Sequence, residues 1–306
     1  MQSIYAYHQT ESTNLPQAER QLLAGIDDLY KLFVYQLSFW VEIRRFAERR
    51  IEENKQKHFP TEEDLNPNLK FIDNQVLRAL EENRHLMKLE EQYKINWADS
   101  REDFIRNMFV KLTETPEYQE YMNNEKSGFA IDKRFLVNVI DTYMPENGLI
   151  FDYYSDRDLS FNSDYQLAIY LLWKFISEIS SSFGAASPLP PVYKDEEEDK
   201  GFVVKLFEKT ILHADEYMEL VKANISNWDY DRLALMDRIL IFMALTEFIE
   251  FHSIPVKVTI NEYIEISKLY STPESRRFIN GMLDRLAKQL TEEGKLVKTG
   301  LGLVDK

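Results

Sequence analysis

The sequence contains no cysteine among its 306 residues. Disulfides, thiol catalysis and thiolate metal sites are therefore excluded, and the composition suits a reducing compartment. Long apolar runs are lacking as well: the longest strictly apolar run, Ile239 to Leu245, is far shorter than the roughly 20 residues of a membrane-spanning helix. The N-terminus has no basic segment followed by an apolar core, so no signal peptide is expected. These absences predict a cytoplasmic protein that does not enter a membrane.

Glycine is scarce, with 9 residues, and β-branched residues rarely alternate with polar ones. Almost every long segment instead has the periodicity of a helix, so we predict an all-α fold. Glycine-rich phosphate loops and nucleophile elbows are absent. We therefore expect no catalytic residues and no cofactor, and we expect that the protein is not an enzyme.

Metal-binding patterns are equally sparse. The five histidines are scattered, and one of them completes a Glu-x-x-His unit, Glu82 to His85. Di-iron helical bundles use two such units together with two further glutamates on facing helices. No second unit is present, so no metal site is predicted.

Positive charge is in short supply, because 37 Lys and Arg face 52 Asp and Glu, for a net charge of −15. The imbalance is uneven: residues 201–306 carry 14 basic and 16 acidic side chains, whereas residues 1–200 carry 23 and 36. Phosphate contacts need lysine and arginine, so the acidic part is a poor surface for nucleic acid. It either attracts basic protein partners or serves solubility alone.

Helical spacing of apolar residues divides the first part of the chain into several predicted helices. Pro60 and Pro116 interrupt the pattern. The predicted helices are one long helix or a pair of helices from Pro16 to about Lys57, Leu69 to Leu89, a helix capped by Asp99 or Ser100, Ile131 to Met144, and Asp164 to Ile179. The proline-rich and acidic stretch 184–201 opposes a packed core and is predicted to be a linker.

The densest basic cluster holds Arg44, Arg45, Arg49 and Arg50. Arg45 and Arg49 are four residues apart and share a helix face. This cluster either contacts phosphate or forms a solvated face that pairs with nearby glutamates. We favour the second interpretation, with Glu42, Glu48, Glu52 and Glu53 as the candidate partners.

Two helix starts are visible near the C-terminus. Thr259 and Glu262 have the spacing of a capping box and predict a helix that begins at Thr259. Thr272 followed by Pro273 predicts a second start, with threonine as the N-cap and proline in the first helical position.

Three segments of this region resemble the NusB family of bacterial transcription antitermination factors. The segments are Asp237 to Glu247, Ile254 to Glu262 and Phe278 to Asp284, and their order and spacing match the family pattern. The resemblance covers residues 202–290 and is faint in residues 1–10. It implies a NusB-like helical bundle at 202–290, a helical region at 1–183 that is mostly an insert, the linker at 184–201, and a flexible tail at 291–306.

The N-terminus departs from the family pattern. Family members usually begin with an arginine-rich stretch that leads into a helix of the kind Val-Gln-Ala-Leu-Tyr. This chain begins Met1-Gln-Ser-Ile-Tyr5-Ala-Tyr7, which looks like that helix without its basic front end. Residues 1–10 are accordingly interpreted as a remnant of the first helix, and we expect either a true start further upstream or the loss of a basic RNA-contacting element.

The resemblance implies a binding function in which no reaction is catalysed. A family member pairs with the NusE-type protein of the small ribosomal subunit, binds a boxA-like single-stranded RNA, and holds RNA polymerase in a processive complex. The positions that match the family's RNA- and partner-binding surface are Tyr5, Asp237, Arg238, Glu274, Arg276 and Arg277. The alternative is a helical protein–protein scaffold that does not bind RNA, a function that the net charge of −15 favours.

Overall fold

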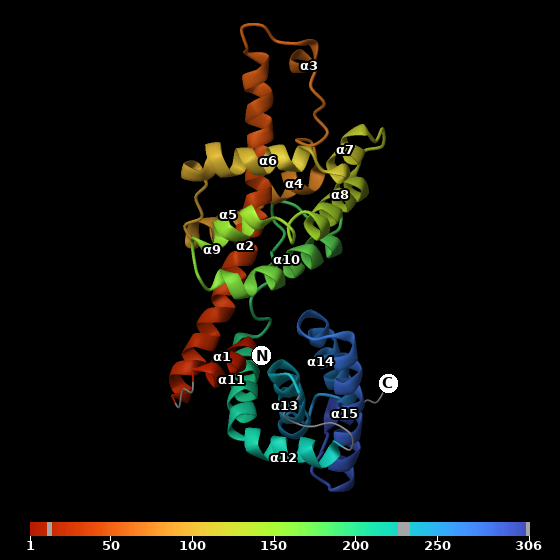
Figure 1. Ribbon diagram of the computed structural model, residues 1–306. Coiled ribbons are helices and arrows are strands. Elements are labelled where there is room, and N and C mark those ends of the chain that lie inside the picture. Colours follow the sequence, from red (N-terminus) through yellow and green to blue (C-terminus); the bar gives the residue numbers. More distant parts are fainter. Residues whose placement is uncertain (11–13, 226–232, 304–306) are drawn as a thin grey trace. The chain divides into compact units, whose positions relative to one another are not determined.

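The structure is a computed structural model, and it describes residues 1–10, 14–225 and 233–303 (Figure 1). Within these ranges every regular element is helical, which confirms the all-α prediction. None of the described helices is long and apolar enough to cross a membrane. The chain divides into two compact units: unit 1 comprises Met1–Ala24 and Tyr193–Lys306, and unit 2 comprises Gly25–Val192.

Unit 2 is built around α2, Leu15–Lys55, whose residues up to Ala24 belong to unit 1. Every side chain from Leu32 to Arg44 is buried, because other helices surround this part of α2 (Figure 1). The other helices of the unit are α3 (Glu62–Leu65), α4 (Gln75–Glu81), α5 (Arg84–Gln92), α6 (Arg106–Thr113), α7 (Pro116–Asn123), α8 (Phe129–Thr142), α9 (Gly148–Ser155) and α10 (Phe161–Glu178). A 3-10 turn, Ala98–Ser100, and a π-helical turn, Arg101–Ile105, precede α6.

The helix predicted from Leu69 to Leu89 is wrong, because the chain forms two short helices there instead. Asn83 separates them: its side-chain oxygen accepts a hydrogen bond from the Leu86 amide at 2.9 Å and so caps α5. Its side-chain nitrogen donates to the carbonyl oxygens of Gly184 and Ser187, at 2.9 and 2.8 Å. These hydrogen bonds to residues about 100 positions away therefore determine where the helix breaks.

Three arginines of the α2 cluster, Arg44, Arg45 and Arg49, are ion-paired, as we favoured from the sequence. Arg44 is buried and donates to the Ile72 carbonyl oxygen, while its guanidinium also pairs with Glu48 and Glu81. Glu42, one of the expected partners, is buried and accepts from Arg49 at 2.8 Å. These three guanidinium groups are engaged by carboxylates of unit 2, whereas Arg50 is exposed and its guanidinium lies 5.8 Å from the centroid of the Phe109 ring.

Asp164, in the first turns of α10, makes the stability of unit 2 depend on pH. Burial, followed by the charge of Asp28, raises the pKa of this carboxyl to about 6, whereas a hydrogen bond from Ser163 opposes the shift. Because the pKa is raised, the folded state binds the proton of Asp164 more tightly than the unfolded state does. The contribution of protonated Asp164 to the free energy of unfolding is therefore present at pH 4 and is lost as the pH rises through 6. We expect Asp164→Asn to raise the free energy of unfolding at pH 7 by about 2 kcal/mol.

Urea unfolding followed by tryptophan fluorescence, at pH 4.5 and at pH 7, measures this effect. In Asp164→Asn, the free energy of unfolding should differ less between the two pH values than it does in the unmodified chain. Asp156→Asn, which neutralises an exposed carboxylate nearby in the sequence, should leave it unchanged. Equal pH profiles for Asp164→Asn and the unmodified chain would contradict the assignment.

Unit 1 is organised around α13, Leu235–Glu250, whose residues Ile239–Phe248 are buried on all sides. α11, α14 and α15 pack on α13, and α1 contributes Ile4 to the same core (Figure 1). The other helices are α1 (Gln2–Gln9), α11 (Glu196–Leu212), α12 (Ala214–Asn224), α14 (Val256–Tyr270) and α15 (Pro273–Glu292), followed by a 3-10 turn, Gly300–Leu303. A helix that is apolar on all sides is stable only when other helices bury it, so α13 lies at the centre of the bundle.

One of the two predicted helix starts is wrong and the other is confirmed. α14 begins at Val256 after Pro255, so Thr259 lies inside the helix. Its hydroxyl donates instead to the buried carboxylate of Glu247 at 2.7 Å, and burial raises the pKa of that carboxyl. Thr272 caps α15 by accepting from the Ser275 amide, with proline in the first helical position.

The predicted linker and flexible tail are more ordered than we expected. Leu189 is buried in the core of unit 2, and residues 196–201 form the first turns of α11, where four acidic residues favour the positive end of the helix dipole. In the tail, the Thr299 amide donates to the His252 carbonyl oxygen at 2.9 Å, and the Lys298 amine donates to the Phe251 carbonyl oxygen at 3.0 Å. Hydrogen bonds that sequence periodicity does not reveal hold both segments, while residues 304–306 lie outside the described ranges.

Candidate nucleic-acid and partner interface

The N-terminal turn of α13 is tied to the corner between α14 and α15. Asp237 is 3% exposed, and its carboxylate accepts a hydrogen bond from the Ser271 hydroxyl at 2.5 Å. Ser271 is the residue between α14 and the N-cap of α15. Asp237 therefore positions this corner.

The first turn of α15 presents three of the predicted site residues. Glu274 and Arg277 are exposed and Arg276 is half-buried. Among the described residues, neither guanidinium has an ion-pair or hydrogen-bond partner. Two positive charges at a helix N-terminus oppose the helix dipole, and an anion bound there would relieve that repulsion. The turn is thus chemically suited to a phosphate.

A second part of the surface joins α1 to α13. Tyr5 is 38% exposed, whereas its neighbour Ile4 is buried in the core of unit 1. His8, one turn further along α1, lies close enough to Arg238 to feel its charge: burial first, and then that positive charge, lower the pKa of the imidazole. His8 is therefore neutral at pH 7, and Arg238 supplies the positive charge of this part.

The structure therefore distributes the six predicted residues over two parts of unit 1. Asp237, Glu274, Arg276 and Arg277 belong to the corner of α13, α14 and α15, and Tyr5 and Arg238 belong to the α1–α13 surface. Sequence reasoning missed Ser271 and His8. Ser271 directly precedes a recognisable N-cap, which is a usable signal, but nothing in the sequence shows that His8 meets Arg238.

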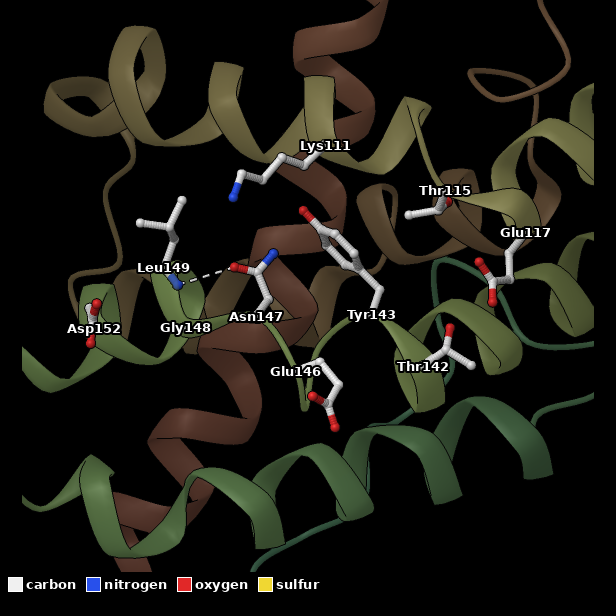
Figure 2. Close-up of a pocket in the computed structure, with 10 residues that line it drawn as sticks. All are labelled: Lys111, Thr115, Glu117, Thr142, Tyr143, Glu146, Asn147, Gly148, Leu149 and Asp152. Atoms are coloured by element: carbon white, nitrogen blue, oxygen red, sulfur yellow. Dashed lines mark hydrogen bonds between the residues drawn. The ribbon is translucent and has the colours of Figure 1, made fainter.

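A cavity of about 540 Å³ in unit 2 holds none of these residues (Figure 2). Its lining comes from α6 to α9 and the segments that join them, and it mixes Lys111 with the carboxylates of Glu117, Glu146 and Asp152. Asn147 is already engaged, since its side-chain oxygen accepts from the Leu149 amide at 3.1 Å and caps α9. The lining offers a surface of mixed charge and no nucleophile held by a base.

The fold and this surface define a class of protein, an all-α protein whose unit 1 bundle carries basic and aromatic side chains at its surface. The NusB family model matches residues 191–288. The transcription antitermination protein NusB of Salinibacter ruber is 41% identical over 105 residues, which are 34% of this chain and 66% of that protein. No solved structure matches the chain.

Two further relatives carry the same name. The Chloroherpeton thalassium protein is 37% identical over 106 residues, which are 35% of this chain and 50% of that protein. The Koribacter versatilis protein is 38% identical over 100 residues, which are 33% of this chain and 68% of that protein. The chain belongs to the NusB family, as the resemblance in its C-terminal helices predicted. It spans half to two thirds of the length of these relatives.

Proposed function

We propose that this chain is a transcription antitermination factor that acts in the cytoplasm together with a NusE-type protein of the small ribosomal subunit. The pair binds a boxA-like single-stranded RNA and keeps RNA polymerase processive on ribosomal RNA genes. The observation that carries the proposal is family membership through residues 191–288, the region that contains Arg276 and Arg277 of α15. No chemical step is needed, because binding alone supplies the effect.

The proposed site uses both parts of the unit 1 surface. Arg276 and Arg277 contact phosphates at the start of α15, and Glu274 and Arg238 contact the protein partner or the RNA. Tyr5 offers an exposed ring, on which a base can stack. Asp237 holds the α14–α15 corner through Ser271, at 2.5 Å, and acts as a positioning residue.

We also propose an origin for the two units. In this proposal α1 corresponds to the first helix of the family bundle, because Ile4 packs into the same core as α13. Unit 2 is then an insert that begins within α2 and returns before α11. The proposed RNA-binding function belongs to unit 1 alone.

An RNA-binding assay tests the proposal. A fluorescently labelled boxA-like RNA is titrated with the chain alone, with the purified NusE-type protein alone, and with both, from 50 to 300 mM salt. We expect at least tenfold tighter binding with both proteins, and an affinity that falls steeply with salt because phosphate contacts release counterions. A flat salt response, or no gain from adding the chain, would count against the proposal.

The scaffold alternative rests on the net charge of −15 and predicts a different result. In that case the chain binds the NusE-type protein but adds nothing to its affinity for RNA. Size-exclusion chromatography of the protein pair, run beside the RNA titration, separates the two functions. A stable protein pair without any gain in RNA affinity would favour the scaffold.

A further inference from the structure

The hairpin between α2 and α3 exposes two large apolar side chains. Phe59 is 86% exposed and Leu65 is 54% exposed. Figure 1 shows that α2 extends beyond α6 before the chain turns back through α3. Burying such side chains yields about 1.5–3 kcal/mol each, and the fold of unit 2 leaves that free energy unused.

The hairpin is nevertheless well ordered by its own polar contacts. Thr61 and Asp64 form a capping box, with the two amide-to-side-chain hydrogen bonds at 3.0 and 3.1 Å. The Lys57 amine pairs with the Asp64 carboxylate at 3.1 Å. A loop that is organised before binding loses little conformational entropy when it docks, so its apolar side chains can contribute most of their transfer free energy.

The base of the hairpin is fixed to the rest of unit 2. The Asn68 side chain donates to the Met122 carbonyl oxygen at 3.1 Å, and the Lys70 amine donates to the Lys126 carbonyl oxygen at 2.8 Å. Between α2 and this returning segment lies a cavity of about 170 Å³ whose lining includes Ile51 and Phe71. The hairpin that carries the exposed side chains is therefore hydrogen-bonded at its base to the rest of unit 2.

Acidic residues surround the exposed apolar pair. Glu53, Glu62 and Glu63 are exposed and have no ion-pair partner among the residues that the structure describes. Glu52 differs, because it pairs with Lys55 at 2.9 Å. The unpaired negative charges repel the phosphates of a nucleic acid and the same surface of a second copy, and they attract a basic protein.

We propose that the hairpin surface, defined as Phe59 and Leu65 with Glu53, Glu62 and Glu63, docks onto a basic protein. Phe59 enters an apolar pocket of that protein, and the glutamates face lysine or arginine side chains at the pocket's rim. Interaction hot spots commonly fill a well-packed pocket near the centre of an interface, and the rim around them is polar. The proposal concerns unit 2 and does not depend on RNA binding by unit 1.

The first experiment places the photo-crosslinker p-benzoylphenylalanine at position 59 of the full chain, expressed in cells that naturally make it. Leu159 is the matched control position, because it is 82% exposed in the same unit. Irradiation should give one protein adduct from position 59 and none of the same mass from position 159. Mass spectrometry of the adduct identifies the partner, which we expect to be a basic protein.

The second experiment measures affinity for the identified protein after purification. We expect Phe59→Ser to weaken binding at least tenfold and Glu62→Gln with Glu63→Gln to weaken it severalfold at low salt, whereas Leu159→Ser leaves it unchanged. An adduct with a second copy of the chain, with an acidic protein or with RNA overturns the proposal. So does the absence of any adduct, or equal affinity of the Phe59→Ser variant.

Discussion

Reversing the charges of Arg276 and Arg277 to glutamate is expected to lower the affinity of the chain and NusE-type protein pair for boxA-like RNA about 100-fold at low salt. Neither guanidinium has a partner among the described residues, so both are available for phosphate, and glutamate in their place repels it. The fold should survive, because Arg277 is exposed and Arg276 is half-buried outside the core of α15. Fluorescence titration of the labelled RNA measures the loss.

A matched control makes that result specific. Lys288→Glu with Lys295→Glu changes the net charge equally, and both lysines are exposed. Lys288 lies roughly 18 Å from Arg276 along the helix, at 1.5 Å per residue. The control should reduce RNA affinity far less than the arginine pair does. An equal loss in both variants would mean that general charge, and not the start of α15, determines binding.

Two further measurements separate RNA binding from folding. Circular dichroism and thermal unfolding should be nearly the same for the arginine variant and the unmodified chain. Binding of the NusE-type protein alone should be retained, because the proposed phosphate contacts involve the RNA only. Loss of RNA binding while the NusE-type protein still binds would support the phosphate site at the start of α15. If the arginine variant does not fold, Arg277→Gln is the milder substitution with which RNA binding is measured.

Replacing Glu42 with alanine is expected to lower the free energy of unfolding of unit 2 by about 3 kcal/mol. The Glu42 side chain is 3% exposed and accepts hydrogen bonds from Arg49 at 2.8 Å and from Arg101 at 2.7 Å. A third arginine, Arg45, lies 4.0 Å away. Removing the shared carboxylate leaves the charges of Arg49 and Arg101 close together without that partner, while Arg45 keeps its ion pair with Glu81 at 2.8 Å.

Urea unfolding of the full chain, followed by tryptophan fluorescence, measures this loss. Glu52→Ala is the control, since it removes a surface carboxylate that pairs only with Lys55 and should cost less than about 0.5 kcal/mol. Arg101→Ala in the Glu42→Ala background should cost less than Arg101→Ala alone, because the two residues interact. Additive effects would show that the ion pair does not contribute.

Local pattern proved sufficient where a short stretch of chain decides its own conformation. The long apolar periodicity from Pro16 predicts helix up to about Lys57, as one helix or a pair, and the structure has the single helix α2 from Leu15 to Lys55. Thr272 and Pro273 predict the start of α15 because a cap needs only four consecutive residues. The expectation that glutamates neutralise the arginine cluster of α2 also follows from neighbours in the sequence, and Glu42 and Glu48 are such neighbours.

Local pattern failed where a partner distant in sequence outweighs it. Thr259 and Glu262 have the spacing of a capping box, yet the Thr259 hydroxyl serves Glu247 in another helix. The clamp of Asn83 on Gly184 breaks a predicted helix and orders a predicted linker through one side chain. Buried polar groups must be satisfied, and the nearest partner in space decides how.

The sequence by itself determined the helical class of this protein and its family, and its six candidate binding residues stay a prediction from the sequence. Helix periodicity and motif spacing are properties of neighbouring residues, so they can be recognised in the sequence alone. Only the tertiary structure decided that Asp237 anchors a corner through Ser271, that the charge of Arg238 lowers the pKa of His8, and that Phe59 is 86% exposed. Burial, ion pairing and exposure depend on which distant segments the fold brings together, and no local pattern contains that information.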